Sequence, residues 1–447
     1  MASRAPSSSS SAKELRPAHH ANNSGTLFRN PWSSADKPTW SELLTISNPL
    51  SWYNNHDLHK HERARDIKVV KPDWGASDLK ARGLKKEKCI VGTWLGHAGV
   101  MVELPLEGIQ EISLKKASSR TSTGSSYPES RARHSLWVLF DPIFSTRAGP
   151  TQYTGPSRMK PSPCQVSDLP DCHAVVISHN HYDHLDLLTL KSILLRFPKC
   201  KYFAPLGNKT WLSSTGVPKD SIHEMDWWSD LELSPRDFGF EVNESADDST
   251  VLRFTCVPAQ HNSGRGTMDQ GSTLWSGWVI DQFLHPKIQE SDKLMVKRTR
   301  KGGVYHAGDT GIRRTAKSED VCPIFEEIGK RLGPFDLSFI PIWRGGTLSF
   351  ISYVGLRLSH QEIPSAFHAS PADAIGIHEA VKSRNTVGVH FGTFIGSENE
   401  SYEATIEFDE AREKQGVETL EKSSHCKNGR AGLLDIGGSI AVETEAR

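Results

Sequence analysis

Four side chains that can bind a metal ion lie within six residues of the chain, in the segment AVVISHNHYDHLD, residues 174–186. They are His179, His181, Asp183 and His184, and they follow a short hydrophobic run that is typical of a buried strand. Borderline cations such as zinc prefer imidazole and carboxylate ligands, and four such groups cannot be buried together without a cation. His179 and His181 can converge on one ion, while Asp183 and His184 can turn toward a second. The spacing therefore predicts a site for two metal ions.

Three residues further along the chain complete this set, and each of them ends an apolar, strand-like run. They are His261 in CVPAQHNSGR, Asp309 in YHAGDTG and His390 in VGVHFGTF. The first cluster by itself could be a solvated polar turn, and each later residue by itself could be an ordinary loop residue. Their recurrence at strand ends instead favours a seven-ligand set suited to two metal ions.

Strands and helices that could position these residues alternate along the middle of the chain. Short β-branched or aromatic runs predict buried strands: WVLF, AVVIS, YFAP, VLRFTCV, GWVI, VYHAG, LSFIPI and TVGVHF. Between them lie helix-length amphipathic segments such as LDLLTLKSILLRF and SPADAIGIHEAVKSR. In the second segment Ser370 can cap the helix and Pro371 can occupy its first turn. We therefore expect sheets with helices on the outside.

The domain organisation predicted from composition is a single large unit with two tails. A length of 447 residues would allow two or three domains, but no linker divides the chain. Residues 1–30 are rich in Ser, Ala and Asn and predict a disordered tail, and residues 421–447 predict a C-terminal strand or tail. Residues 31–420 are expected to form the main domain, with insertions near 107–134 and 285–303.

Charge and cysteine usage exclude several classes of protein. Lys+Arg and Asp+Glu both total 53, so there is no global field to attract nucleic acid. No stretch approaches the roughly 18 to 20 apolar residues that span a bilayer. The seven scattered cysteines favour reduced thiols in an intracellular protein and are assigned no metal role. The Ser-rich start has some features of a mitochondrial transit peptide, but its few arginines favour a plain tail.

The order HxHxDH, then His, then Asp in a GDTG turn, then a late His resembles the metallo-β-lactamase superfamily. The resemblance implies an α/β (α+β) fold, an αββα sandwich of two mixed β-sheets flanked by helices. It implies two Zn²⁺ per chain, with a metal-bridging hydroxide as the nucleophile. By the same resemblance, one zinc would be bound by His179, His181 and His261, the other by Asp183, His184 and His390, and both by Asp309.

Further segments resemble the N-acylphosphatidylethanolamine-hydrolysing phospholipases D, a family within this superfamily. They are TWLGHAGVMVEL, LFDPIFSTRAGPTQYTGPSR, SHNHYDHLD, PAQHNSGRG, HAGDTG, FHASPADAIGIH and VHFGTF, and they cover roughly residues 94–394 apart from the insertions. The resemblance implies a zinc-dependent enzyme at a membrane surface. Its hydroxide would attack phosphorus in N-acylphosphatidylethanolamine, releasing N-acylethanolamine and leaving phosphatidic acid. The phospholipid is then the expected partner, and a homodimer is left open.

The family resemblance also implies contacts with the substrate. Tyr182 and His368 match positions that contact the phospholipid, so His368 joins Asp309 as an expected catalytic residue. Gln152 and Tyr153 match a further active-site segment. Tyr182 could instead pack under the metal loop, and His368 could be a helix-start residue with no ligand.

Other histidines and one aspartate are expected to support the site. Asp141 in FDPIF is interpreted as a carboxylate that orients a metal-binding histidine, whereas His97 and His306 are interpreted as satisfied core or orienting groups. The segment LDLLTLKSILLRFP suggests peripheral attachment to a membrane, with a core helix as the alternative. The competing functions are a lactonase or other hydrolase of a small phosphorylated substrate, a nuclease, and a silent scaffold or di-iron protein.

Overall fold

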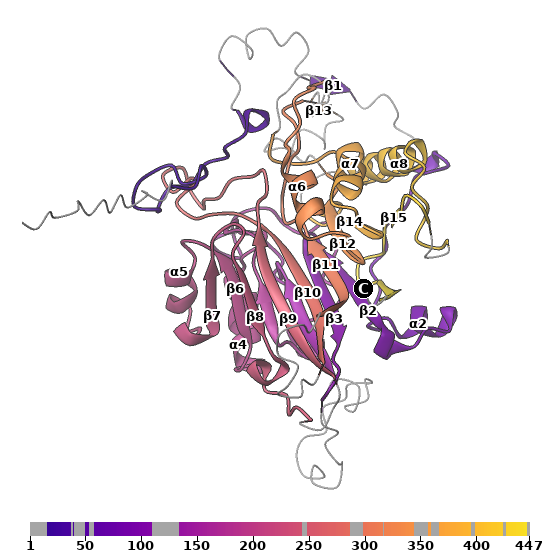
Figure 1. The fold of residues 1–447 in the computed structure, drawn as a ribbon. Helices are drawn as coiled ribbons and strands as arrows, with labels where there is room; N and C mark the ends of the chain where they lie inside the picture. The colour runs from indigo at the N-terminus through magenta and orange to yellow at the C-terminus, as the bar shows by residue number, and fades with distance from the viewer. Residues whose placement is uncertain are drawn as a thin grey trace, which may run out of the picture.

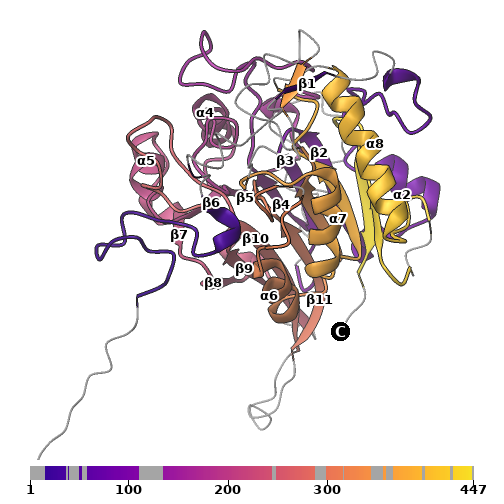
Figure 2. The same cartoon turned by 90° about the horizontal axis from the view of Figure 1, so that it is seen from above.

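Two β-sheets face each other and helices cover their outer faces in the computed structural model (Figures 1 and 2). This is the αββα sandwich that the family resemblance implies. The structure describes residues 16–36, 39, 50–52, 58–109, 134–243, 248–286, 298–315, 317–343, 356–358, 366–394, 398–422 and 426–444.

The first sheet is built mostly from the first half of the chain, in the order β16-β2-β3-β4-β5-β6-β7. Neighbouring strands are antiparallel from β16 to β4 and parallel from β4 to β7. Its strands are β2 (Cys89–Gly96), β3 (Gly99–Pro105), β4 (Ser135–Phe140), β5 (Ala174–Val176), β6 (Lys201–Pro205), β7 (Ile222–Met225) and β16 (Ser439–Glu443).

The second sheet repeats this succession of pairings, in the order β15-β14-β12-β11-β10-β9-β8. Pairs from β8 to β11 are antiparallel and pairs from β11 to β15 are parallel. The two halves of the sandwich are therefore built alike. The strands are β8 (Asp230–Leu233), β9 (Asp248–Val257), β10 (Gly277–Pro286), β11 (Thr299–His306), β12 (Leu337–Pro341), β14 (Asn385–Val389) and β15 (Arg430–Gly432).

Helices α4 and α5 pack on the outer face of the first sheet, while α6, α7 and α8 lie on the side of the second (Figure 2). The two helices predicted from the sequence are α4 and α7. Ser370 caps α7 by accepting from the Asp373 backbone N–H, and Pro371 is its first residue. The helices are α2 (Ala76–Arg82), α4 (Leu187–Arg196), α5 (Lys209–Ser214), α6 (Ile324–Arg331), α7 (Pro371–Ala380) and α8 (Glu398–Lys414).

Short elements connect the main ones. Strands β1 and β13 form a separate two-stranded antiparallel pair. The bounds of these strands and of the 3₁₀ turns are β1 (Leu50–Trp52), β13 (Leu356–Leu358), η1 (Ser33–Ala35), η2 (Leu58–Lys60), η3 (Lys86–Lys88), η5 (Val166–Asp168), η6 (Lys219–Ser221) and η7 (Pro235–Phe238).

The core between the sheets is aromatic and closely packed. Phe203 of β6 stacks on Phe254 of β9 with ring centroids 4.1 Å apart, and both side chains are fully buried. At Gly92 of β2 an added Cβ would lie 2.6 Å from Phe339 Cζ of β12, so only glycine allows the sheets to approach there. Each buried aromatic side chain contributes roughly 1.5 to 3 kcal/mol. This packing fixes one sheet against the other, and with it the loops at the strand ends.

The N-terminal expectation was wrong for residues 16–30. Phe28 is 5% exposed and belongs to the main core, and its backbone N–H donates to Gly271 O at 2.8 Å. His19 and His20 both contact Asp226. Buried aromatic surface and these hydrogen bonds offset the entropy lost on ordering, which the polar composition of the segment concealed. Residues 1–15 lie outside the described part of the chain.

The two predicted insertions are only partly described. Strands β10 and β11 pair as far as Leu284 with Thr299, so 299–303 belong to a strand and not to an insertion. Residues 110–133 and 287–297 lie outside the described residues. At the C-terminus, β15 and β16 are edge strands of the two sheets, so residues 430–432 and 439–443 contribute strands to the sandwich.

Candidate metal centre

Histidine and aspartate side chains from both sheets meet at one edge of the sandwich. Each follows the carboxyl end of a strand, and the packing of the sheets brings these ends together. The strand ends and the residues that follow them are β2 with His97, β4 with Asp141, β5 with the loop 178–184, β9 with His261, β11 with Asp309 and β14 with His390.

One group of donors consists of three imidazoles. His179 Nε2 lies 2.8 Å from His181 Nδ1, and His261 Nε2 lies 3.2 Å from the first nitrogen and 3.4 Å from the second. His261 donates its Nδ1–H to the Phe367 backbone carbonyl at 2.8 Å, so its Nε2 carries a lone pair. Lone pairs this close repel one another unless a cation lies among them.

The second group combines two histidines and a carboxylate. His184 Nε2 lies 3.3 Å from His390 Nε2, and Asp183 Oδ2 lies 3.6 Å from His184 Nε2 and 3.9 Å from His390 Nε2. His97 adjoins this group, because its Nε2–H donates to Asp183 Oδ2 at 2.7 Å. The structure thus brings these side chains together from three strand ends.

Asp309 lies between the two groups and is 3% exposed. Its Oδ2 is 3.1 Å from His184 Nε2 and 3.8 Å from His261 Nε2, and its Oδ1 is 3.0 Å from His390 Nε2. One carboxylate therefore faces histidines of both groups. This is the arrangement that a ligand shared by two metal ions requires.

Asp141 and Ser178 orient the first-sheet histidines. Asp141 Oδ2 accepts from His184 Nδ1–H at 2.9 Å, so His184 Nε2 faces Asp309. Ser178 donates its backbone N–H and its hydroxyl to Asp141 at 2.7 and 2.6 Å, and the same hydroxyl lies 2.9 Å from His179 Nδ1. A carboxylate on the outer nitrogen of a histidine is the usual support for a metal ligand. The donor set fits a pair of divalent cations.

The electrostatics of the cluster keep several of its side chains in the protonation state that binds a metal ion. Burial holds the pKa values of His179 and His261 well below the usual value, so both imidazoles are neutral at pH 7. Burial alone would raise the pKa of Asp309, but His184 and His390 hold it well below its usual range. At His184 burial lowers the pKa, yet the carboxylates of Asp309, Asp183 and Asp141 outweigh burial and raise it. The cluster therefore attracts positive charge.

Backbone strain is concentrated around the cluster. His97, Asp141 and His390 have φ values of 53°, 39° and 64°, in the left-handed region that residues other than glycine rarely occupy. Such conformations cost of order 1 to 3 kcal/mol each and persist where the surrounding structure holds them. All three belong to the contacts described above, so the strain is located where the side chains must converge.

Tyr182 packs beside the cluster. The Arg265 guanidinium lies 4.6 Å from its ring centroid and 4.2 Å from that of Trp211, so the arginine is held between two rings. The Arg265 Nε–H also donates to Asn180 O at 2.7 Å. Tyr182 therefore helps to fasten the β9–β10 loop, which carries His261, to the HNHYDH loop.

His368 reaches the cluster from the segment before α7. Its Nδ1 lies 3.9 Å from Asp309 Oδ2, its ring centroid is 5.1 Å from that of His261, and its side chain is 25% exposed. Among the described residues, this Nδ1 atom has no hydrogen-bond partner. His368 therefore offers a free ring nitrogen beside the cluster.

Gln152 and Tyr153 lie on the loop after β4 and, among the described residues, share no recorded contact with the cluster. Both ends of the Gln152 amide bond the Arg147 backbone at 3.2 Å, and Tyr153 is 92% exposed. The loop approaches the cluster through Arg158, which lies over Phe394, and the Phe394 ring meets His97 edge-on at 5.2 Å.

Gln260 has a role that the sequence analysis missed. Its amide accepts from Ser34 Oγ at 2.6 Å and donates to Ala366 O at 2.8 Å, joining three segments next to His261. Asn30 donates its side-chain amide to His261 O at 2.7 Å. The only sequence signal was the position of Gln260 directly before His261, because its partners are remote in the chain.

His97 and His306 differ in their surroundings. His97 contacts Asp183 and so orients a donor, which is one of the two roles expected for it. His306 is buried and its Nε2 lies 3.1 Å from the Ala98 backbone carbonyl, in the core below the cluster.

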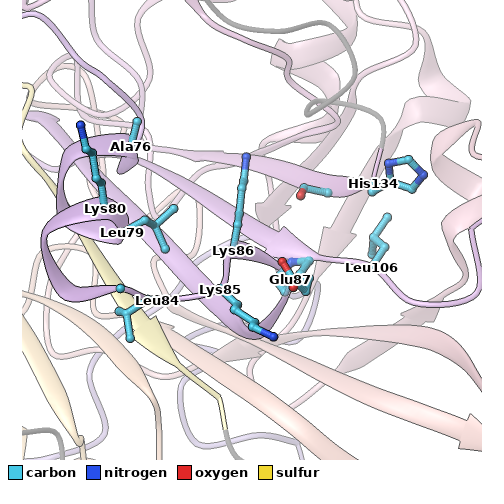
Figure 3. A pocket seen from close by; sticks show the side chains of 12 residues that line it. Ala76, Leu79, Lys80, Leu84, Lys85, Lys86, Glu87, Leu106 and His134 are labelled. Atoms are coloured by element: carbon cyan, nitrogen blue, oxygen red, sulfur yellow. The ribbon is translucent and has the colours of Figure 1, made fainter. Parts of the chain in front are cut away.

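A cavity of about 760 Å³ lies at the other end of the first sheet, where β3 ends and β4 begins. It is lined by residues of α2 and by Lys85, Lys86, Leu106 and His134 (Figure 3). Figure 3 shows Lys80 and Lys85 pointing in different directions, so they do not form one cationic cradle. The cavity is separate from the histidine cluster.

Two mixed sheets carrying converging histidines and aspartates at a shared edge define a metallo-β-lactamase fold with a cluster suggestive of a binuclear metal site. The beta-lactamase superfamily domain family matches residues 136–391, and this chain belongs to that family. The matched range contains all seven candidate ligands.

Similar proteins include N-acyl-phosphatidylethanolamine-hydrolyzing phospholipase D 1 of Caenorhabditis elegans. It is 29% identical over 382 residues, which span 85% of this chain and 84% of that protein. The mitochondrial enzyme of the same name from Saccharomyces cerevisiae is 26% identical over 260 residues, covering 58% of this chain and 44% of that protein. The resemblance predicted from the motifs is confirmed. Igni18, a metallo hydrolase of Ignicoccus hospitalis, aligns at 16% identity with a TM-score of 0.39, over 80% of this chain and 100% of that one.

Proposed function

We propose that this chain is a zinc-dependent phosphodiesterase that hydrolyses N-acylphosphatidylethanolamine to N-acylethanolamine and phosphatidic acid. The observation that carries the proposal is the position of Asp309 between two groups of histidines. The names of the similar worm and yeast proteins support the choice of substrate.

In this proposal the seven side chains hold two zinc ions, which when bound neutralise phosphate oxygens and lower the pKa of water toward about 7. The chain's own residues orient the ligands. Asp141 fixes the ring of His184, the Phe367 carbonyl fixes that of His261, and His97 fixes the carboxylate of Asp183. One ion would be held by His179, His181 and His261, the other by Asp183, His184 and His390, and both by Asp309.

His368 is proposed to contact the reacting phosphate or its leaving group. Burial lowers its pKa to about 4, although Asp309 acts in the opposite direction, so the ring is neutral at pH 7. A neutral imidazole with one unpaired nitrogen can form a hydrogen bond to a phosphate oxygen or to the departing alcohol. We place Tyr182 beside the substrate as well, as a half-buried ring braced by Arg265.

We assign separate roles to Gln152 and Tyr153 in the loop after β4. Tyr153 is proposed to contact the apolar part of the lipid, because its ring is almost fully exposed. Gln152 is proposed to act through the loop, since its amide already bonds the Arg147 backbone at both ends.

We propose peripheral membrane binding through α4, which begins just after the HNHYDH loop. Leu188 and Leu195 of this helix are 49% and 85% exposed. No helix among the described residues has the length and apolar content needed to cross a bilayer. Exposed leucines beside Lys191 suit a helix lying in the headgroup region. We expect Leu188→Asp/Leu195→Asp to abolish flotation with phosphatidylcholine liposomes, while the matched exposed pair Leu27→Asp/Val70→Asp still floats.

An intracellular location, with a mitochondrial one as the specific hypothesis, accompanies this proposal. The name of the yeast relative supports it. Fluorescence microscopy of the full chain tagged at its C-terminus, with a mitochondrial marker, tests the hypothesis; uniform exclusion from the organelle would reject it.

The decisive experiment offers four substrates to the purified protein and identifies the products by mass spectrometry. They are N-acylphosphatidylethanolamine, phosphatidylcholine, RNA and a phosphosugar lactone. We expect N-acylethanolamine and phosphatidic acid from the first, in amounts that fall when zinc is removed. Lactone opening without any N-acylethanolamine would support the alternative hydrolase and reject our substrate.

A further inference from the structure

A third group of metal-binding side chains lies outside the cluster at the strand ends. It joins the N-terminal strap, residues 16–36, to the turn after β7. His19 Nε2 lies 2.7 Å from Asp226 Oδ1, and His20 Nε2 lies 2.9 Å from Asp226 Oδ2. The two histidine side chains are only 10% and 14% exposed, and that of Asp226 is 29% exposed. Two imidazoles separated from the carboxylate by more than 200 residues thus share its two oxygens.

The surroundings hold these donors in fixed orientations. The His19 ring stacks on Trp227 with centroids 4.3 Å apart, and the His20 ring meets Phe28 edge-on at 5.2 Å. The Trp227 backbone N–H donates to Asp226 Oδ1 at 2.8 Å and orients the carboxylate. In protein metal sites the ligand side chains are usually oriented by outer hydrogen bonds and surrounded by apolar groups. Both features are present around His19, His20 and Asp226.

The charge and spacing of the donors suit a borderline divalent cation. Imidazoles bind metal ions in their neutral form, so two of them with one carboxylate offer a charge of −1 in a mostly buried place, which a divalent ion compensates. The nitrogen-to-oxygen distances of 2.7 and 2.9 Å fall among those between donors of the main cluster, such as 2.8 Å for His179 with His181.

We propose that His19, His20 and Asp226 bind a third divalent metal ion of the zinc class, with water completing its coordination. The ion would act as a clamp, because the strap continues from it to the main cluster. Asn30 donates to His261 O at 2.7 Å, and Ser34 donates to Gln260 Oε1 at 2.6 Å. The clamp therefore supports the segment that holds His261 in place.

Metal content of the full-length protein tests the proposal independently of its activity. Protein purified in chelator-free buffer with zinc is dialysed and analysed by inductively coupled plasma mass spectrometry. We expect about three zinc ions per chain in the wild type and about two in His19→Ala/His20→Ala. The matched control His59→Ala/His61→Ala changes two histidines of the same chain outside the cluster and keeps about three.

A second variant covers the case in which the double variant fails to fold. Asp226→Asn keeps the size of the side chain and one hydrogen bond to a histidine but removes the charge, so we expect it to lose one zinc ion per chain while its circular dichroism spectrum is unchanged. Equal zinc content in the wild type, the double variant and Asp226→Asn would overturn the proposal and leave a hydrogen-bonded contact in its place.

Discussion

The two sheets of this sandwich supply their metal-site residues in different ways. The first sheet contributes four donors from one loop after β5, residues 179–184, together with Asp141 and His97 from neighbouring strand ends. The second sheet contributes one donor after each of β9, β11 and β14. The strand pairings in the two sheets follow the same succession, so the difference lies in the loops and not in the sheets.

The two halves also differ in the hydrogen bonds that hold their metal-binding side chains in place. In the first half, Asp141 and Ser178 orient His184 and His179 through a compact set of hydrogen bonds. In the second half, His261 depends on segments that are remote in the chain. The Phe367 carbonyl accepts from its ring, and the N-terminal strap bonds its backbone. One half is organised locally, and the other is organised by tertiary contacts that can be removed one at a time.

Asp309→Asn would give the largest effect, because Asp309 is where the two halves meet. The change removes the negative charge that faces His184, His390 and His261. We expect the rate of product formation to fall by at least about 1000-fold, which corresponds to a loss of roughly 4 kcal/mol of transition-state stabilisation. The protein should stay folded. Mass-spectrometric rates and circular dichroism measure the two parts. A variant with near-normal turnover would contradict the bridging position.

Asp141→Asn tests the local half. An amide NH₂ in place of Oδ2 accepts neither from Ser178 Oγ–H nor from His184 Nδ1–H, so the ring of His184 loses its support. We expect a loss of about 10- to 100-fold in activity or zinc affinity. Asp230→Asn, at an exposed carboxylate in β8, serves as the control and should leave both unchanged. If the two variants behave alike, Asp141 does not orient a ligand.

Acid pH should destabilise both halves of the sandwich, each through one buried histidine. Burial lowers the pKa of His378, although its hydrogen bond to Asn428 O acts in the opposite direction. Burial also lowers that of His173, but there Asp171 partly offsets the effect. Since the folded chain keeps these rings neutral, the unfolded chain takes up more protons below pH 6.5, and stability is lost as the pH falls.

The loss amounts to at most about 1.4 kcal/mol for each unit of pH below 6.5 and each histidine. Urea unfolding at pH 7.5 and 5.5 measures it. We expect His378→Gln and His173→Gln each to reduce the difference between the two midpoints. A variant that leaves this difference unchanged would mean that its histidine does not contribute to the acid sensitivity.

Ser34→Ala should give the smallest effect and tests the remote support of the second half. It removes the hydroxyl that donates to Gln260 Oε1, a single hydrogen bond worth about 1 kcal/mol. We expect an activity loss of roughly fivefold and an equally small loss of stability. Ser24→Ala, on an exposed turn of the same strap, is the control. If both variants match the wild type, the strap does not help to place His261.

The sequence predicted sheets with outer helices and the metal-binding residues because their signals are local, whereas the αββα sandwich was implied by the family resemblance. Buried strands appear as apolar runs, and HNHYDH concentrates four donors in one loop. The folded conformation of the N-terminal strap could not be predicted from the sequence. Phe28, Asn30 and Ser34 form no recognisable motif, and their partners lie more than 200 residues away. The role of Gln260 was hidden for the same reason.

The sequence alone determined which residues can bind metal and on which strand ends they lie. Only the tertiary structure decided that Asp309 faces both groups, that Asp141 and the Phe367 carbonyl fix individual imidazole nitrogens, and that the strap supports His261. The physical reason is the distance along the chain over which each interaction acts. Strand and helix propensities act within a few residues, whereas ligand orientation depends on hydrogen bonds between segments that meet only when the two sheets pack.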